Sequence, residues 1–216
     1  SDPADQHGHG THTAGTIGAA GNNGVGVTGV NWNVKLMTIK IYSAAATDST
    51  SAMLVNAYNY IRMMKNRGVN VRVTNNSYGD CPEACGYDQA TRDALDALGE
   101  AGVLNVFAAG NNNRNIDTGA PHYPASYNLP TILSVASSTT TDSRSSFSNY
   151  GTTSVDLAAP GSGIYSTTFG SNSTYGSMSG TSMASPHAAG AAALLSAYNP
   201  NLSAASLKAT LMNTVD

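Results

Sequence analysis

Two patterns of apolar residues alternate along this chain, one with helical spacing and one of short β-rich runs. Residues 51–66 carry apolar side chains at helical spacing, and residues 88–101 combine an acidic start with a second apolar stripe. Short β-rich runs at 69–74 and 103–108 flank the second of these segments. The small residues of 9–20 complete a third helical pattern. The first half of the chain therefore predicts helices separated by buried strands.

The second half continues in the same way. Residues 34–41, 131–136 and 154–159 predict further strands, and residues 165–176 are typical of a hairpin. Residues 203–213 predict a closing helix that its first serine caps. Because strands and helices alternate, we expect an α/β fold of three layers, a mostly parallel central sheet with helices on both faces.

Length and charge narrow the class of protein. The chain has 216 residues, enough for one well-cored α/β domain, and only 11% of them are charged. A net charge of -3 gives no reason to expect a nucleic acid or an acidic membrane as partner, and no apolar run is long enough for a membrane span. Since no initiating Met or signal-peptide pattern is present, we expect a mature or trimmed segment.

Residues 180–187, GTSMASPH, precede a run of small apolar residues that predicts a buried helix. Gly180 permits a tight entry, and Pro186 is expected in the first helical turn, where its missing N–H costs nothing. Ser182 would then lie at a helix N-terminus, which favours developing negative charge. That position suits a nucleophile, although a lone serine before a helix is more often only a cap.

Two further motifs decide between these interpretations. Residues 9–12 read HGTH, and residues 108–111 read AAGN. In this order, and with GTSMASPH, they resemble the subtilisin-like serine peptidases over nearly the whole chain. The resemblance implies that His9 is the general base, Asn111 an oxyanion donor and Ser182 the nucleophile of an acyl-enzyme mechanism.

The resemblance also implies where a substrate binds. The segment of residues 76–79, after one predicted strand, would pair with an extended polypeptide and would also line the pocket for the side chain before the scissile bond. Walls of Gly and Ala leave room there for a sizeable apolar residue. The family has a cis peptide beside this pocket, which matches Tyr123–Pro124. The implied substrate-binding residues are Ser77, Tyr78, Gly79, Ala108, Ala109 and Gly110.

A turn-rich Gly/Asn loop follows the first predicted helix. In the resembled family such a loop binds calcium through backbone carbonyls and one Asn side chain, and oxygen ligands suit this hard cation. Further ligands of the family site come from upstream segments that these residues do not include, so we expect weakened binding. The matching positions are Gly21, Asn23, Val25 and Val27.

The chain has two cysteines, Cys81 and Cys85. A zinc site is discounted because no further Cys or nearby His completes one. A short disulfide that closes a surface loop fits secretion, whereas two free thiols would fit a cytosolic protein. We expect the disulfide and an extracellular location.

The acid of a Ser–His–Asp triad has no match. In the family it lies on a first strand before HGTH, whereas here only polar residues precede His9, and neither Asp2 nor Asp5 fits the motif. We therefore expect residues 1–216 to be a single catalytic domain that is truncated at the N-terminus and stops short at the C-terminus.

The leading interpretation is a secreted, monomeric serine endopeptidase that acts on polypeptides, with an inhibitor or propeptide as a further partner and no organic cofactor. One alternative is an inactive fragment or pseudoenzyme that needs its missing segment. Another is an esterase or lipase, but those have Gly-x-Ser-x-Gly and the order Ser, acid, His, whereas His9 here comes first.

Overall fold

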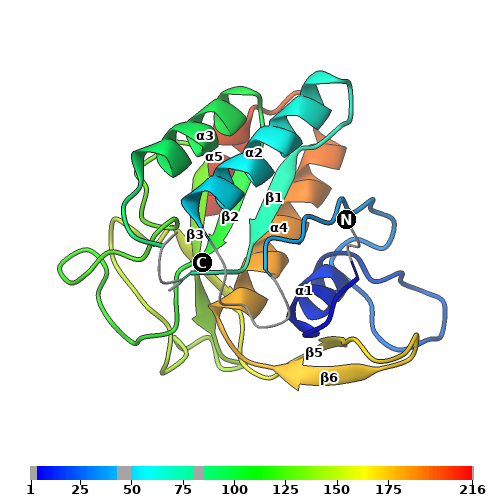
Figure 1. The fold of residues 1–216 in the computed structure, drawn as a ribbon. Helices are drawn as coiled ribbons and strands as arrows, with labels where there is room; N and C mark the ends of the chain where they lie inside the picture. Colours follow the sequence, from blue (N-terminus) through cyan, green and yellow to red (C-terminus); the bar gives the residue numbers. More distant parts are fainter. Residues whose placement is uncertain (1–3, 43–49, 80–84, 216) are drawn as a thin grey trace.

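A computed structural model of the chain describes residues 4–42, 50–79 and 85–215 (Figure 1). Its elements in chain order are α1 (His9–Gly18), α2 (Ser51–Asn66), β1 (Val73–Asn76), α3 (Gln89–Glu100), β2 (Leu104–Ala108), β3 (Ile132–Ser138), β4 (Leu157–Pro160), β5 (Ile164–Thr167), β6 (Tyr175–Met178), α4 (Thr181–Tyr198) and α5 (Ala204–Asn213). No helix in these ranges is both long and apolar enough to cross a membrane.

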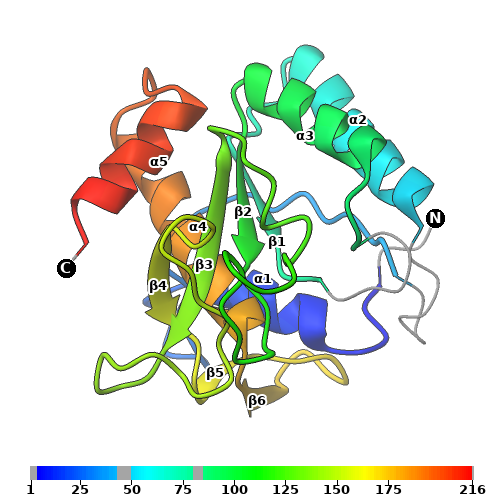
Figure 2. The same ribbon diagram turned by 90° about the vertical axis from the view of Figure 1, so that its left-hand side faces the viewer.

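A parallel sheet forms the middle layer. Its strands lie in the order β1-β2-β3-β4, and β5 and β6 form a separate antiparallel hairpin. Helices α2 and α3 cover one face of the sheet, and α4 and α5 cover the other (Figure 2). Strand β2 is buried at every position because both of its faces are covered. The expected three-layer, mostly parallel α/β fold is confirmed.

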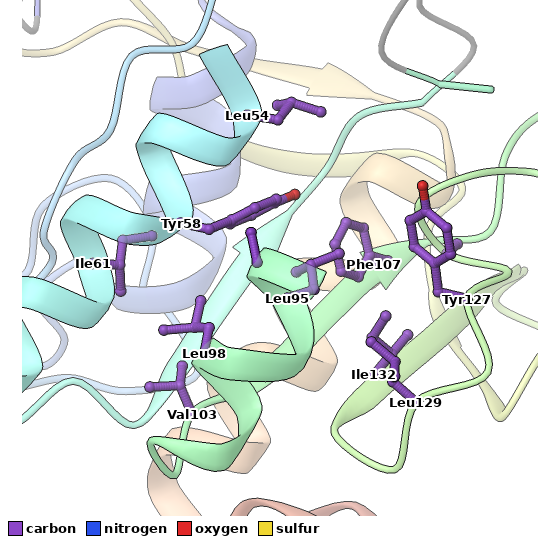
Figure 3. Packing of buried hydrophobic residues seen from close by; sticks show 12 residues of the cluster. Leu54, Tyr58, Ile61, Leu95, Leu98, Val103, Phe107, Tyr127, Leu129 and Ile132 are labelled. Atoms are coloured by element: carbon purple, nitrogen blue, oxygen red, sulfur yellow. The ribbon is translucent and has the colours of Figure 1, made fainter. Parts of the chain in front are cut away.

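Each face of the sheet has its own apolar core. Under α2 and α3, large side chains such as Leu54, Tyr58 and Leu98 pack against Phe107 and Ile132 from the sheet (Figure 3). The opposite core is built largely of alanines from α4 against β2 and β3. Small residues let α4 approach the sheet closely, so its first turn lies near the strand ends.

The helix boundaries follow local hydrogen bonds. The side chains of Thr50, Asp88 and Ser203 each accept a backbone N–H from the first turn of α2, α3 and α5, respectively. These caps satisfy donors that have no partner within a helix. The predicted helices at 51–66 and 88–101 and the Ser203 cap are therefore confirmed.

Three strand predictions are wrong in whole or in part. The strand expected at 154–159 begins only at Leu157. Residues 34–41 form no strand with any described residue, and Leu36 is 43% exposed there. A strand needs a hydrogen-bonded neighbour, which an alternating pattern cannot guarantee. The strand expected from residue 69 begins only at Val73, since the N–H of Val69 still bonds to the carbonyl of Met64 in α2.

The sheet brings distant segments together at one edge. Because β1 and β2 are parallel, their carboxyl ends lie side by side, and Asn76 pairs with Phe107 there. Residues 77–79 and 109–111 continue from these ends. Helix α4 packs against all four parallel strands and begins near the same edge, which positions Ser182 beside both loops.

Leu98 tests the core between α3 and the sheet, because its side chain is fully buried. Replacing it by alanine removes packing and leaves a cavity, so we expect Leu98→Ala to lower the free energy of unfolding by about 2–5 kcal/mol in denaturant titrations. Leu194→Ala is the matched control, since Leu194 is 53% exposed. Equal losses for the two variants would contradict the assignment of this core.

Candidate active site

Ser182 lies in the first turn of α4. The N-cap is Gly180, whose φ of 157° and ψ of 162° are open to glycine and to few other residues. The N–H of Met183 bonds back to the Gly180 carbonyl at 3.0 Å. As the second residue of the helix, Ser182 presents an N–H that has no acceptor within the helix. The serine therefore sits where backbone donors and the helix dipole favour an anion.

Pro186 lies in the second turn of α4, so its predicted place in the first turn is wrong. Within a helix the N–H of residue 186 would bond to the carbonyl of Ser182, and proline has no N–H to give. That carbonyl instead accepts a hydrogen bond of 2.8 Å from the Ser77 hydroxyl. A side chain from outside the helix thus replaces the missing donor, which is why the proline is tolerated.

The loop after β1 is tied to α4 by further hydrogen bonds. The Ser182 hydroxyl donates to the Ser77 carbonyl at 3.2 Å, and the Ser185 hydroxyl donates to the Asn75 amide oxygen at 2.8 Å. The Asn75 amide in turn donates to the Ser77 hydroxyl at 3.0 Å. These bonds join the end of β1 to the turn that carries Ser182.

Asn111 fixes the end of β2 to the same turn. Its amide oxygen accepts the Thr181 N–H at 2.8 Å and the Thr181 hydroxyl at 3.0 Å. Since the oxygen is committed, the other end of the amide is the NH₂ group, which can only donate. Asn111 and Ser182 both line the cavity described next.

A cavity of about 150 Å³ lies where these elements meet. It gathers most of the residues predicted for the site, although Ala109 is fully buried and is not part of the lining. The Tyr78 side chain packs in the core against Phe107, with ring centroids 6.0 Å apart, and burial raises its pKa well above the usual value. The lining residues are Ser77, Tyr78, Gly79, Ala108, Gly110, Asn111, His122, Thr181 and Ser182.

His122 and Thr181 line the cavity although the sequence analysis gave them no role, and Thr181 holds Asn111 as described above. His122 is 3% exposed and directly precedes Tyr123–Pro124, whose peptide bond is cis, as the resemblance implied. The position of this peptide beside the specificity pocket was the one signal in the sequence that could have pointed to His122.

His9 begins α1, which packs against α4. Burial lowers its pKa, and the neighbouring His7 and His12 lower it further against the opposing effect of Asp5. His9 does not line the cavity, and no hydrogen bond joins it to Ser182 among the residues described. The structure therefore places the two residues on helices that pack together, with no hydrogen bond between them among the described residues.

Asp5 serves the start of α1. Its carboxylate accepts the N–H groups of His7, Gly8 and Thr11 and the Thr11 hydroxyl, at 2.6 to 2.9 Å. Burial raises the pKa of this carboxyl, but these hydrogen bonds outweigh it and hold the pKa well below its usual range. Its hydrogen bonds thus fix the helix start and do not reach the His9 ring. Asp2 lies outside the described residues.

The predicted calcium loop curls around a cavity of about 220 Å³ that residues 20–28 line, including Gly21, Asn23, Val25 and Val27. The Asn23 side-chain oxygen accepts the Val25 N–H at 3.0 Å. No carboxylate lies in this lining, so the donors are neutral oxygens. Of the two cysteines, Cys81 lies outside the described residues, and the disulfide stays a prediction.

Comparison with known proteins gives a consistent result. Residues 1–216 match the family described as the Subtilase family. The chain is 40% identical over 196 residues to subtilisin-like protease 4 of Trichophyton equinum, covering 90% of this chain and 45% of that protein. It is 39% identical over 210 residues to an alkaline protease of Alkalihalobacillus alcalophilus, covering 97% and 50%.

Comparison with solved structures agrees with the family match. A cold adapted subtilisin-like serine proteinase matches with a TM-score of 0.81 and 34% identity, over 97% of this chain and 68% of that one. Sphericase matches with a TM-score of 0.84 and 28% identity, over 97% and 70%. The chain spans about half the length of the two curated relatives. Motifs, fold and comparisons together show that the chain belongs to the subtilase family.

Proposed function

We propose that the protein is a secreted serine endopeptidase that hydrolyses extended polypeptides through an acyl-enzyme on Ser182. The observation that carries the proposal is the meeting of Ser182 and Asn111 at one cavity, with the Asn111 oxygen held by Thr181. That hydrogen bond turns the amide so that its donor is available beside the helix N-terminus. Both groups needed to stabilise an oxyanion are then present.

In this mechanism the Ser182 hydroxyl attacks the scissile carbonyl while His9 accepts its proton. The Ser182 N–H and the Asn111 amide hold the oxyanion, and His9 then gives the proton to the leaving amine. A water molecule releases the acid from the acyl-enzyme by the same steps. For subtilisin itself, loss of the amide donor is known to lower kcat by about 10²–10³, and we expect a comparable role for Asn111.

Substrate binding uses the loop after β1. Residues 77–79 continue from a strand end, and such a segment pairs through its backbone with an extended peptide. Tyr78 suits this role because its partly buried side chain packs against the core and holds the segment in place beside the cavity. Cleavage requires the Ser182 hydroxyl to leave the Ser77 carbonyl and turn toward His9.

The test is intact mass of the purified chain before and after a fluorophosphonate probe, which reacts with activated serines. We expect one adduct, lost in Ser182→Ala and kept in Ser171→Ala, a matched control at the exposed tip of the hairpin. An adduct that survives in Ser182→Ala would contradict the assignment of the nucleophile.

A second candidate is an inactive fragment or pseudoenzyme, and one observation favours it. The Ser182 hydroxyl bonds to the Ser77 carbonyl, and no described carboxylate hydrogen-bonds to His9. Without an acid to orient the imidazole, turnover falls by about 10⁴, as subtilisin itself shows. A folded sample that gives no adduct with the probe would support this candidate over the peptidase.

The pKa of His9 gives a second prediction. Because burial, His7 and His12 lower it, His9 should stay neutral, and able to accept a proton, below its ordinary pKa of about 6.5. Proton NMR titration should place its midpoint below that value. His7→Gln removes a like charge and should raise the midpoint, whereas His187, which His7 does not influence, should not move. A His9 midpoint above 6.5 in the unmodified chain would contradict this.

Calcium in the loop of residues 20–28 would be held by the carbonyls of Gly21, Val25 and Val27 and by Asn23. The neutral donor set predicts weak binding, with a Kd of about 10⁻⁴–10⁻³ M. We expect about 10 mM calcium to raise the melting temperature more than the same concentration of magnesium does. A chelator should reverse this rise. Asn23→Ala should reduce the rise, and Asn172→Ala, on the exposed hairpin tip, should not. A melting temperature that does not change when calcium is added would exclude the site.

A further inference from the structure

The His122 side chain occupies a fixed place in the wall of the active-site cavity. The backbone N–H of His122 donates to the Ser126 hydroxyl at 3.0 Å, and the backbone N–H of Ser126 donates back to the His122 carbonyl at 2.9 Å. The turn is thereby closed on itself, and Tyr123 next to it packs against the core under α3. The ring is 3% exposed yet lines the same cavity as Ser182.

The ring lies against both walls of the proposed substrate pocket. A Cβ built on Gly110 would lie 2.6 Å from Cε1 of His122 and 2.7 Å from its Nδ1. A Cβ built on Gly79 would overlap Nε2 of the same ring. Gly79 follows β1 and Gly110 follows β2, so the imidazole sits between the two loops and fills the space that opens between them.

We infer that His122 is a specificity-determining residue that shortens the pocket for the side chain preceding the scissile bond. A small side chain, such as that of alanine or serine, fits above the ring, whereas a large aromatic one meets it. The inference rests on the proposed function, since it assigns the pocket of that site. It reverses the expectation of a sizeable apolar residue, which considered only the Gly and Ala walls.

The ring cannot be treated as a mobile lid. Backbone encloses it at two glycines, and its own backbone is held by the paired bonds with Ser126. A bulky substrate side chain would have to displace the ring and open that turn together. Selection by size therefore follows from packing and needs no charge on the imidazole.

The experiment measures binding rather than turnover, so that it does not depend on catalysis. Acetylated tetrapeptides that differ only in a C-terminal Ala, Phe or Glu are titrated by NMR into the Ser182→Ala chain. We expect the Ala peptide to bind at least about tenfold more tightly than the Phe peptide. Adding His122→Gly should improve Phe binding by at least about tenfold. His122→Gln, similar in size, should keep the preference for Ala.

Other outcomes overturn the inference. Equal binding of the Ala and Phe peptides would show that the ring does not limit the pocket. Tightest binding of the Glu peptide, lost in His122→Gln, would show that the imidazole recognises charge instead. If His122→Gly fails to give a cooperative melting transition, His122→Ala takes its place. The relative affinity of the Ser182→Ala chain for the Ala and Phe peptides still tests the inference without either variant.

Fluorophosphonate labelling of the unmodified chain separates this result from the proposed function. A preference for the Ala peptide without labelling keeps the pocket assignment and rejects the hydrolase. Labelling of Ser182 without a preference for the Ala peptide keeps the hydrolase and rejects the pocket assignment. Each proposal therefore has its own readout.

Discussion

The cavity depends on one backbone group, the carbonyl oxygen of Ser182. Pro186 deprives it of its helical partner, and Ser77 supplies another from the loop after β1. A single hydrogen bond of this kind contributes about 0.5–1.5 kcal/mol, but a buried carbonyl left without a donor costs about 1–3 kcal/mol. The proline thus makes the loop and the helix mutually dependent. The proposed nucleophile on the helix and the proposed substrate-binding segment on the loop are held in register by that constraint.

The parallel sheet makes a second connection of the same kind. Strand β2 ends beside β1, and Asn111 beyond it accepts two hydrogen bonds from Thr181, the residue before Ser182. Two strand ends are therefore fixed to consecutive residues of one helical turn. Because these strands are buried in a sheet covered on both faces, the first turn of α4 is hydrogen-bonded to a well-packed part of the fold. The oxyanion site that we propose needs donors that do not reorganise, and these hydrogen bonds fit that need.

The sequence could predict elements that local chemistry decides and not those that a partner decides. The helix at 51–66 and the Ser203 cap were predictable because spacing and a cap act within a few residues. Residues 34–41 have the pattern of a strand, but pairing is set by what lies alongside. Pro186 was misplaced for a similar reason, since its compensating donor, Ser77, lies far away in the sequence. The motifs pointed to Ser182 and Asn111, whereas the closing of the pocket by His122 appears in no motif.

Glycine is favoured at the two positions beside His122 for different physical reasons. Gly110 has a φ of 98°, a conformation that strains other residues, so its backbone already favours glycine. Gly79 is not among the glycines of positive φ, and its backbone tolerates a side chain. What a Cβ at Gly79 would meet is the imidazole of His122. Glycine at that position is thus explained by the ring. A side chain at position 79 therefore requires a smaller residue at 122, whereas Gly79 itself is compatible with a smaller residue there.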